Sequence, residues 1–315
     1  MTLPADVSAL RAERGEGACH AGVLCPLRGE IGGMTDTSAT DALDSAEWGR
    51  WIMYAQRYRE SFVRLCAHPV DALLDAAGVS EGMYVLDAGT GTGTAARRAQ
   101  RRGARVRGVD VDPGGIAQAR GSGVNATNHP LPELPFADGE FDVVLANFVI
   151  DCLDRPRTSL AELRRVLRPG GRIALTLWGA RRGAGQNLLG RACEAGGIVL
   201  PPDRPSPDEP RDLPPLDADE EFDRTPAGML ELLGEAGFTR TEATEVTWNH
   251  ETTVREWWGG LADRLYLRPA YVTPPDLETT ARIRAEYERL SAEFPQRDEK
   301  LLLPHVALLA SGRLT

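Results

Sequence analysis

One short stretch holds the residues whose types and spacing could carry out chemistry. It reads Val85-Leu86-Asp87-Ala88-Gly89-Thr90-Gly91-Thr92-Gly93-Thr94, so an aspartate precedes three glycines at alternate positions. Glycine has no Cβ, which lets the backbone turn sharply and lets a ligand approach it closely. A second aspartate, Asp110, ends the next apolar run. A carboxylate at the tip of a strand can accept two hydrogen bonds from vicinal ribose hydroxyls, so the stretch predicts a cofactor that contains a nucleoside.

The glycine spacing separates two classes of cofactor. The dinucleotide fingerprint is G-x-G-x-x-G, whereas this chain has G-x-G-x-G with Asp87 two residues before the first glycine. A carboxylate at that place is a poor neighbour for a pyrophosphate and a good one for a cation. S-adenosylmethionine, which carries a sulfonium, an amino group and a ribose, therefore fits better than a nicotinamide dinucleotide.

These residues need a framework that brings strand ends together. Apolar runs alternate with helical runs five times between residues 84 and 178. We expect strands at residues 84–86, 105–109, 124–127, 143–148 and 172–178, and helices at 95–102, 113–120 and 158–167, the last stopped by residues 168–171. This alternation predicts an α/β fold with a doubly wound, mostly parallel sheet.

The flanking segments predict additional elements around that sheet. We expect residues 1–40 to be disordered, with Met34 as an alternative start, and residues 41–80 to form an N-terminal helical cap. Residues 81–315 would form the core, with inserted elements that bind the acceptor within 180–300. In that part we expect helices at 186–195, 226–237, 254–267 and 277–294, a polar loop at 201–224, and strands at 239–252 and 301–314.

Three further motifs carry a family resemblance. They are the block 141–149, the helix and turn 160–171 that end in Arg168-Pro169-Gly170-Gly171, and the segment 230–238. With the glycine stretch, they resemble the class I S-adenosylmethionine-dependent methyltransferases that act on small molecules, best over residues 82–178. The resemblance implies a Rossmann-like sheet of seven strands, the last one antiparallel, and S-adenosylmethionine as the cofactor.

The resemblance also assigns roles to the matching positions. The amino-acid end of the cofactor would lie against Asp87, Ala88, Gly89, Gly91 and Gly93. Asp110 would bind the ribose and Val111 would pack on the adenine. The reaction side would be lined by Asn147 and Phe148, and tyrosines of the N-terminal cap, Tyr58 above all, would touch the methionine part.

One departure from the family pattern affects the adenine contacts. The family usually carries an acidic residue after the third strand, but this chain reads Asn128-His129-Pro130-Leu131-Pro132-Glu133, with no acid at the expected offset. Asn128 or His129 would substitute for it. The departure also leaves open a protein of this fold that binds the cofactor in a non-donor role and catalyses a cyclisation or an isomerisation.

Methyl transfer from a sulfonium is an in-line displacement, so the protein mainly supplies alignment, exclusion of water and a place for a proton. A general base is needed only where the nucleophile arrives protonated. The candidates are Asp151, which follows the fourth strand, His129, and His250 near the end of a strand; His68 and His305 are interpreted as structural. Three tryptophans could shape a site for a flat apolar acceptor or could pack in the core: Trp178, Trp257 and Trp258.

Composition narrows the class of protein. The 315 residues carry a net charge of −10, which argues against nucleic acid as a partner. The five cysteines form no C-x-x-C pair, and no metal-binding spacing occurs, so we expect reduced thiols, a cytoplasmic location and no metal. We expect no membrane span and no signal peptide, and a monomer or homodimer.

The sequence thus predicts S-adenosylmethionine-dependent transfer of a methyl group to an O, N or C atom of a small metabolite, in secondary metabolism. One alternative is the cyclisation or isomerisation above. A nicotinamide oxidoreductase is a second, and it rests on fold analogy alone. A non-catalytic binding module is a third, and no residue pattern in the sequence indicates it.

Overall fold

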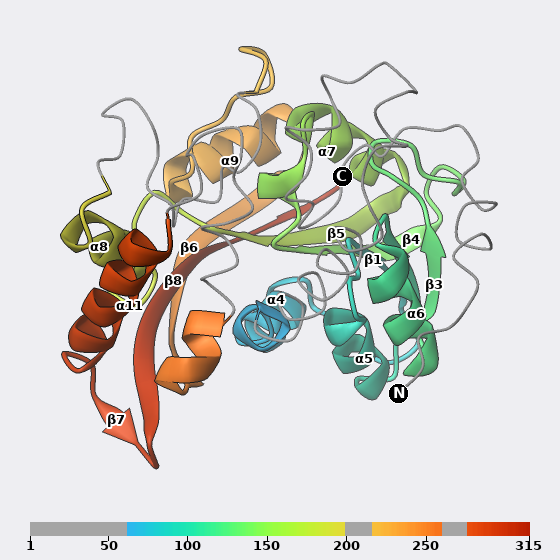
Figure 1. The fold of residues 1–315 in the computed structure, drawn as a ribbon. Helices are drawn as coiled ribbons and strands as arrows, with labels where there is room; N and C mark the ends of the chain where they lie inside the picture. Colours follow the sequence, from blue (N-terminus) through green and yellow to red (C-terminus); the bar gives the residue numbers. More distant parts are fainter. Residues whose placement is uncertain (1–61, 199–215, 260–275) are drawn as a thin grey trace, which may run out of the picture.

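The computed structural model describes residues 62–198, 216–259 and 276–315 (Figure 1). The expected N-terminal extension, with Met34, lies outside the described residues, as do Tyr58 and most of the expected cap. The same holds for residues 201–215 of the expected polar loop and for 260–267 of the expected helix at 254–267. The division of the chain into an extension, a cap and a core stays a prediction.

The strands form one sheet in the order β3-β2-β1-β4-β5-β8-β6, with the two-residue β7 beside β8. Their bounds are β1 Tyr84–Ala88, β2 Arg105–Asp110, β3 Asn125–Asn128, β4 Phe141–Asn147, β5 Leu167–Leu177, β6 Thr239–Thr252, β7 Gln296–Arg297 and β8 Lys300–Arg313. Strands β1 to β5 pair in parallel, and β8 runs antiparallel to both β5 and β6. The predicted mostly parallel sheet with an antiparallel last strand is confirmed, and β7 adds a short eighth strand.

Helices cover both faces of this sheet, as the doubly wound pattern predicted (Figure 1). One face carries α4 (Val70–Ala76), α5 (Thr94–Arg101) and α6 (Pro113–Gly121), and the other carries α7 (Pro156–Arg165) and α9 (Pro226–Glu235). Helices α8 (Leu188–Ala195) and α11 (Leu277–Ser291) pack on each other beside the N-terminal end of β8. The short turn η1 (Ile150–Cys152) follows β4. None of the described helices is long and apolar enough to cross a bilayer.

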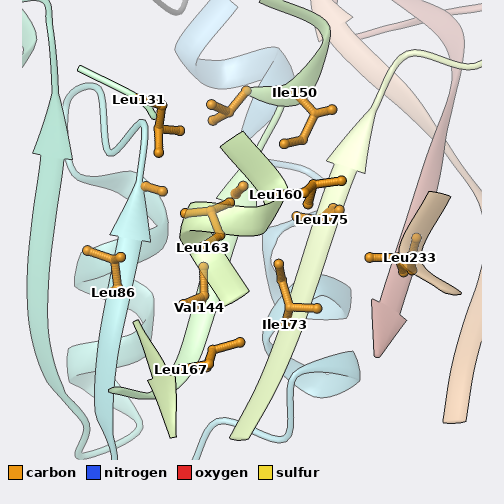
Figure 2. Close-up of a cluster of buried hydrophobic side chains, with 14 of the residues drawn as sticks. Leu86, Leu131, Val144, Ile150, Leu160, Leu163, Leu167, Ile173, Leu175 and Leu233 are labelled. Atoms are coloured by element: carbon orange, nitrogen blue, oxygen red, sulfur yellow. The ribbon is translucent and has the colours of Figure 1, made fainter. Parts of the chain in front are cut away.

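The central strand β4 is buried on both faces because its side chains alternate between two cores. Val144 and Ala146 point to the core under α7 and α9, whereas Val143 and Leu145 point to the core under α4, α5 and α6. Figure 2 shows the first of these cores, where Leu160 and Leu163 of α7 lie over the sheet. Each fully buried aliphatic side chain contributes about 1.5–3 kcal/mol.

The pair β6–β8 extends past the parallel strands. Leu177, the last residue of β5, pairs with Leu308, so residues 301–307 of β8 pair with β6 and no longer with β5. Pro304 lies in this extension, where β8 no longer pairs with β5 and a missing N–H is tolerated. The extension carries aromatic side chains beyond the carboxyl edge of the sheet.

Several boundaries differ from the sequence expectation, and the largest shift is at the start of β5. Helix α7 ends at Arg165, two residues early, because Leu167 already pairs with Phe141 as part of β5. Residues 168–171 therefore do not stop the helix; they form a register shift inside the strand pair β4–β5.

Candidate functional site

Asp87 and Asp110 lie at the same edge of the sheet, at the carboxyl ends of the adjacent parallel strands β1 and β2. One turn touches both side chains. The Thr90 hydroxyl donates a hydrogen bond to Oδ2 of Asp87 (2.8 Å), and the Gly91 N–H donates one to Oδ2 of Asp110 (2.7 Å). We call residues 87–93 together with Asp110 the cofactor turn.

The glycines of this turn differ in what surrounds them. Gly89, Gly91 and Gly93 all have positive φ angles, of 68°, 51° and 83°, which favour glycine. A Cβ on Gly93 would lie 3.0 Å from a methyl of Val124, whereas a Cβ on Gly91 would meet nothing within 4 Å. Gly93 is therefore required by packing, and Gly91 presents bare backbone to the side from which a ligand can approach.

Asp87 keeps one carboxylate oxygen without a partner. The residue is 1% exposed, and its Oδ2 accepts hydrogen bonds from Thr90 and from the Ala96 N–H (3.0 Å) of α5. Its Oδ1 is buried and has no hydrogen-bond partner among the described residues. Burial, and to a lesser extent the nearby Asp110, raises the pKa of Asp87 to about 7. An ammonium beside Oδ1 would supply the missing hydrogen bond and offset the cost of the buried charge, and a sulfonium would offset the charge alone. The site therefore suits a cation, and an ammonium best.

Asp110 is held more completely. Its Oδ1 accepts hydrogen bonds from the N–H groups of Val111 (2.7 Å) and Asp112 (2.9 Å), and its Oδ2 accepts the one from Gly91. Burial raises the pKa of Asp110. An ionised carboxyl has about four lone-pair sites, so about one remains for a ribose hydroxyl, where the sequence led us to expect room for two. Asp112 caps α6 as expected, with hydrogen bonds from the N–H groups of Gly114 and Gly115.

The two candidates for the adenine contact lie beside Val111 and Asp110. The Asn128 amide donates a hydrogen bond to the Val111 carbonyl (3.1 Å), which leaves its oxygen as the atom that can accept. The His129 backbone N–H donates to the Asp110 carbonyl (3.1 Å), and its ring is half-buried. Both residues therefore border the position expected for the adenine, and Asn128 has the acceptor that an exocyclic amine needs.

The reaction side is formed by residues after β4. Asn147 spans two segments: its amide donates to the Cys66 carbonyl (3.0 Å) and accepts from the Thr176 hydroxyl (2.7 Å). Phe148 has a φ of 56°, in the left-handed region, where a bulky residue costs about 1–3 kcal/mol. Its ring packs on Trp178, with centroids 4.3 Å apart. Phe148 thus presents an aromatic wall, whereas both ends of the Asn147 amide hold the fold together.

Asp151, the leading candidate base, is engaged at both oxygens. Oδ2 accepts the Trp178 N–H (2.7 Å), and Oδ1 pairs with Nε of Arg224 (3.1 Å). The two side chains are 2% and 12% exposed, so this is a buried ion pair. These contacts make Asp151 a residue that positions Trp178; its service as a base stays a prediction.

Eight aromatic side chains of the described residues form one cluster beyond the carboxyl edge of β4 and β5. We call them the aromatic cluster: Phe62, His68, Phe148, Trp178, Trp248, His250, Trp257 and His305. Trp248 faces His305 in the register of β6 and β8, with centroids 5.8 Å apart. His250 follows two residues later on the same face and lies 4.9 Å from Trp257.

Of the three tryptophans that the sequence suggested, Trp178 and Trp257 belong to this cluster, whereas Trp258 packs on Tyr287 of α11 (5.1 Å). Sequence reasoning missed Trp248 and left His68 and His305 as structural. The spacing of Trp248 and His250 along one strand was the available signal, but the partner strand could not be read from it.

Polar atoms of the cluster are buried and neutral. Burial lowers the pKa of His250 to about 3 and of His305 to about 4, and it lowers the pKa of His68 as well. All three rings are therefore uncharged imidazoles at neutral pH. Nδ1 of His250 and Nε1 of both Trp248 and Trp257 are buried without a hydrogen-bond partner in the described parts of the chain. The described residues contain no group of His, Cys, Asp or Glu that could hold a metal ion.

Two residues that shape the cofactor turn, one within it and one in β2, also escaped the sequence reasoning. Thr90 is one, through its hydrogen bond to Asp87. Gly108 is the other, because a Cβ there would lie 2.8 Å from the Thr90 side chain. The absence of a side chain at Gly108 therefore leaves the space in β2 against which the Thr90 side chain packs.

Comparison with known proteins identifies a matching family. Residues 86–175, from β1 into β5, match the family described as "Methyltransferase domain". The demethylmenaquinone methyltransferase of Tropheryma whipplei (strain Twist) is 36% identical over 102 residues, which are 31% of this chain and 43% of the relative. O-methyltransferase resE of Aspergillus sclerotiorum is 30% identical over 182 residues, 53% of this chain and 59% of the relative. The chain thus spans about half the length of these curated relatives.

A solved structure resembles a larger part of the chain. The YcgJ protein of Bacillus subtilis matches 78% of this chain and 98% of its own, with a TM-score of 0.49 and 18% identity.

Proposed function

Because residues 86–175 form a class I S-adenosylmethionine-dependent methyltransferase domain, as the motifs indicated, we propose that the protein transfers the methyl group of S-adenosylmethionine to a small molecule. One observation carries the proposal. The cofactor turn holds a buried carboxylate oxygen of Asp87 that has no partner among the described residues, in the same turn as the bare backbone of Gly91.

The residues present fit this cofactor. Asp87 would hold its positively charged amino-acid end, and Asp110 would accept one ribose hydroxyl. Val111 would pack on the adenine, and the Asn128 oxygen would accept its exocyclic amine. When bound, the cofactor supplies an activated methyl group on sulfur. Everything else that the reaction needs falls to the chain.

The chain's own contribution is alignment and exclusion of water. Phe148 and Trp178 form an aromatic wall after β4 and β5, and the Asp151–Arg224 pair fixes the backbone of Trp178. Alignment of two reactants can supply about 7–11 kcal/mol of a barrier. A small-molecule acceptor is supported by the named relatives, one of which acts on demethylmenaquinone.

The finer parts of the function are also proposals. The scattered cysteines and the net charge of −10 support a cytoplasmic enzyme without a nucleic-acid partner, and the resemblance supports a role in secondary metabolism.

Two measurements test the proposal. Isothermal titration should show S-adenosylmethionine binding to the purified protein. Incubation with methyl-labelled cofactor and a small-molecule extract should yield a labelled organic product and S-adenosylhomocysteine. Absence of binding would contradict the proposal. Binding together with substrate turnover that leaves the cofactor unchanged would favour the cyclisation or isomerisation instead.

A further inference from the structure

We propose that the aromatic cluster binds the methyl acceptor, and that it selects a flat aromatic compound with hydrogen-bond-accepting oxygens, such as a phenol or quinol, over an amine. The proposal rests on the proposed function for one point only, the naming of this ligand as the methyl acceptor.

The cluster continues the edge of the sheet that carries the cofactor turn. The strand order β2-β1-β4-β5 places Asp110, Asp87, Phe148 and Trp178 along one edge in that sequence. Neighbouring strands lie about 4.8 Å apart. From Trp178 the ring contacts run on to Trp248 and His305 of the β6–β8 extension. A molecule that lies on the cluster therefore has one end near the place expected for the methyl group.

The exposure of the cluster is graded from the surface inward. His68 is exposed and Trp178 and Trp248 are half-buried, whereas His250, His305 and Trp257 are 2–3% exposed. The side chains between these ends are rings, and rings pack best against flat apolar ligands. The exposed fraction of the rings thus falls from His68 at the surface to Trp257 in the interior.

The buried end of the cluster contains polar atoms without a hydrogen-bond partner among the described residues. Nε1 of Trp248 and of Trp257 are donors only, and both are buried without a partner in the described residues. Such orphaned groups are rare in native structures, because a buried donor without an acceptor has lost its hydrogen bond to water. A ligand oxygen would satisfy them. The third unpaired atom, Nδ1 of His250, can donate or accept according to the tautomer.

Nearby charges disfavour a cationic ligand. Arg64 acts on His250, Arg182 on His305 and Arg98 on His68, in each case against protonation of the ring. Glu251 is the acid that acts in the opposite direction, on His68. An ammonium would meet the same charges as a protonated histidine, with Arg64 and Arg98 also paired to Glu256 (4.0 Å) and Asp71 (2.8 Å), whereas a neutral phenol carries no such cost.

The selection agrees with transfer to oxygen. The acceptor oxygen forms a bond to the methyl carbon while the methyl–sulfur bond breaks, and the sulfur keeps the electron pair as a neutral thioether. The phenolic proton passes to water, because the lowered pKa values of His250 and His305 make these rings weak bases.

The test is calorimetric binding of three probes that share one ring system: dihydroxynaphthalene, naphthalene and naphthylmethylammonium. Each is titrated into the full chain with and without S-adenosylhomocysteine, so that a failure of cofactor binding remains visible separately. We expect dihydroxynaphthalene to bind about tenfold tighter than either of the other probes, since one or two hydrogen bonds distinguish them. Equal affinities, tighter binding of the ammonium, or no binding of dihydroxynaphthalene would overturn the proposal.

A pair of neighbouring tryptophans supplies matched variants. Trp257→Phe keeps an aromatic ring but removes the N–H together with the five-membered ring that carries it, and should weaken dihydroxynaphthalene about 3- to 10-fold more than naphthalene. Trp258→Phe, on the same helical segment but packed on Tyr287, should change neither. Equal effects of the two variants would contradict the proposal. If Trp257→Phe lowers the thermal unfolding midpoint markedly, the half-buried Trp248→Phe repeats the comparison.

Discussion

The cofactor turn and the aromatic cluster differ in how their polar atoms are satisfied. In the turn, Asp110 accepts three backbone N–H groups and Asp87 accepts two hydrogen bonds, which leaves one open oxygen. In the cluster, two indole N–H groups and one imidazole nitrogen have no hydrogen-bond partner within the part of the chain that the structure describes. The turn is therefore largely organised before any ligand binds, whereas the cluster is completed by its ligand. Changes in the turn should affect stability and cofactor binding together, and changes in the cluster should affect the acceptor.

The largest expected effect concerns the junction of the two regions. Asp151→Ala removes the nearer acid partner of the buried Arg224, which then keeps the longer pair with Glu221 (3.9 Å), and should lower the free energy of unfolding by about 3–5 kcal/mol. Chemical denaturation measures it. Arg284→Ala, which breaks the exposed pair with Glu288 on α11, should cost less than about 1 kcal/mol. Similar losses in both variants would show that the Asp151 pair is not buried as described.

The next effect separates cofactor binding from acceptor binding. Asp110→Ala removes an acceptor of charged hydrogen bonds, and should weaken S-adenosylmethionine by about 1.5–3 kcal/mol, roughly 10- to 150-fold, in calorimetric titration. Asp112→Asn is the control, because asparagine caps a helix as well as aspartate does. Binding of dihydroxynaphthalene should be the same in both variants. Equal cofactor affinities in the two variants would remove Asp110 from the site.

A smaller effect tests whether Gly93 is needed for packing and Gly91 for access of the cofactor. Gly91→Ala and Gly93→Ala both place a side chain at positive φ and should each lose about 1–2 kcal/mol of stability. Gly93→Ala should lose more, because its Cβ meets Val124. Gly91→Ala should instead lose more cofactor affinity, because its Cβ points to the open side. Thermal unfolding should therefore show the larger loss of stability in Gly93→Ala, and calorimetry should show the larger loss of cofactor affinity in Gly91→Ala.

The two regions also differ in how far the sequence could predict them. The turn is local: Asp87, the glycines and Asp110 fall within two consecutive strand–helix units, so spacing alone predicted that they would share one edge. The cluster draws His68, Trp178, His250 and His305 from distant parts of the chain. Their meeting depends on the register of β6 against β8 and on the length of that pair beyond β5, which no local pattern encodes.

Side-chain partners were the other unpredictable feature. The place of Asp151 after β4 was predicted, but its ion pair with Arg224, 73 residues away, was not. The same holds for the Asn147 amide, which is bonded to Cys66 and Thr176. A carboxylate or amide at a strand end can bind a ligand or hold the fold, and only its long-range partners decide between the two.

The most direct measurement of the central claim is the affinity for S-adenosylmethionine as a function of pH, in the native protein and in Asp87→Asn. The folded-state pKa of Asp87, about 7, lies above its ordinary value of 3.8. Without ligand, the folded state therefore keeps a proton that the unfolded chain has lost, and stability falls as pH rises between these two values. A cationic ligand needs the ionised carboxylate, so its affinity should rise with pH and level off above about 7.

Asp87→Asn should bind more weakly, and any slope that it retains belongs to the cofactor's own amino group. A steeper rise in the native protein than in the variant is the result that we predict. Equal affinities and equal slopes in the two proteins would contradict the claim that the open oxygen of Asp87 holds the cofactor.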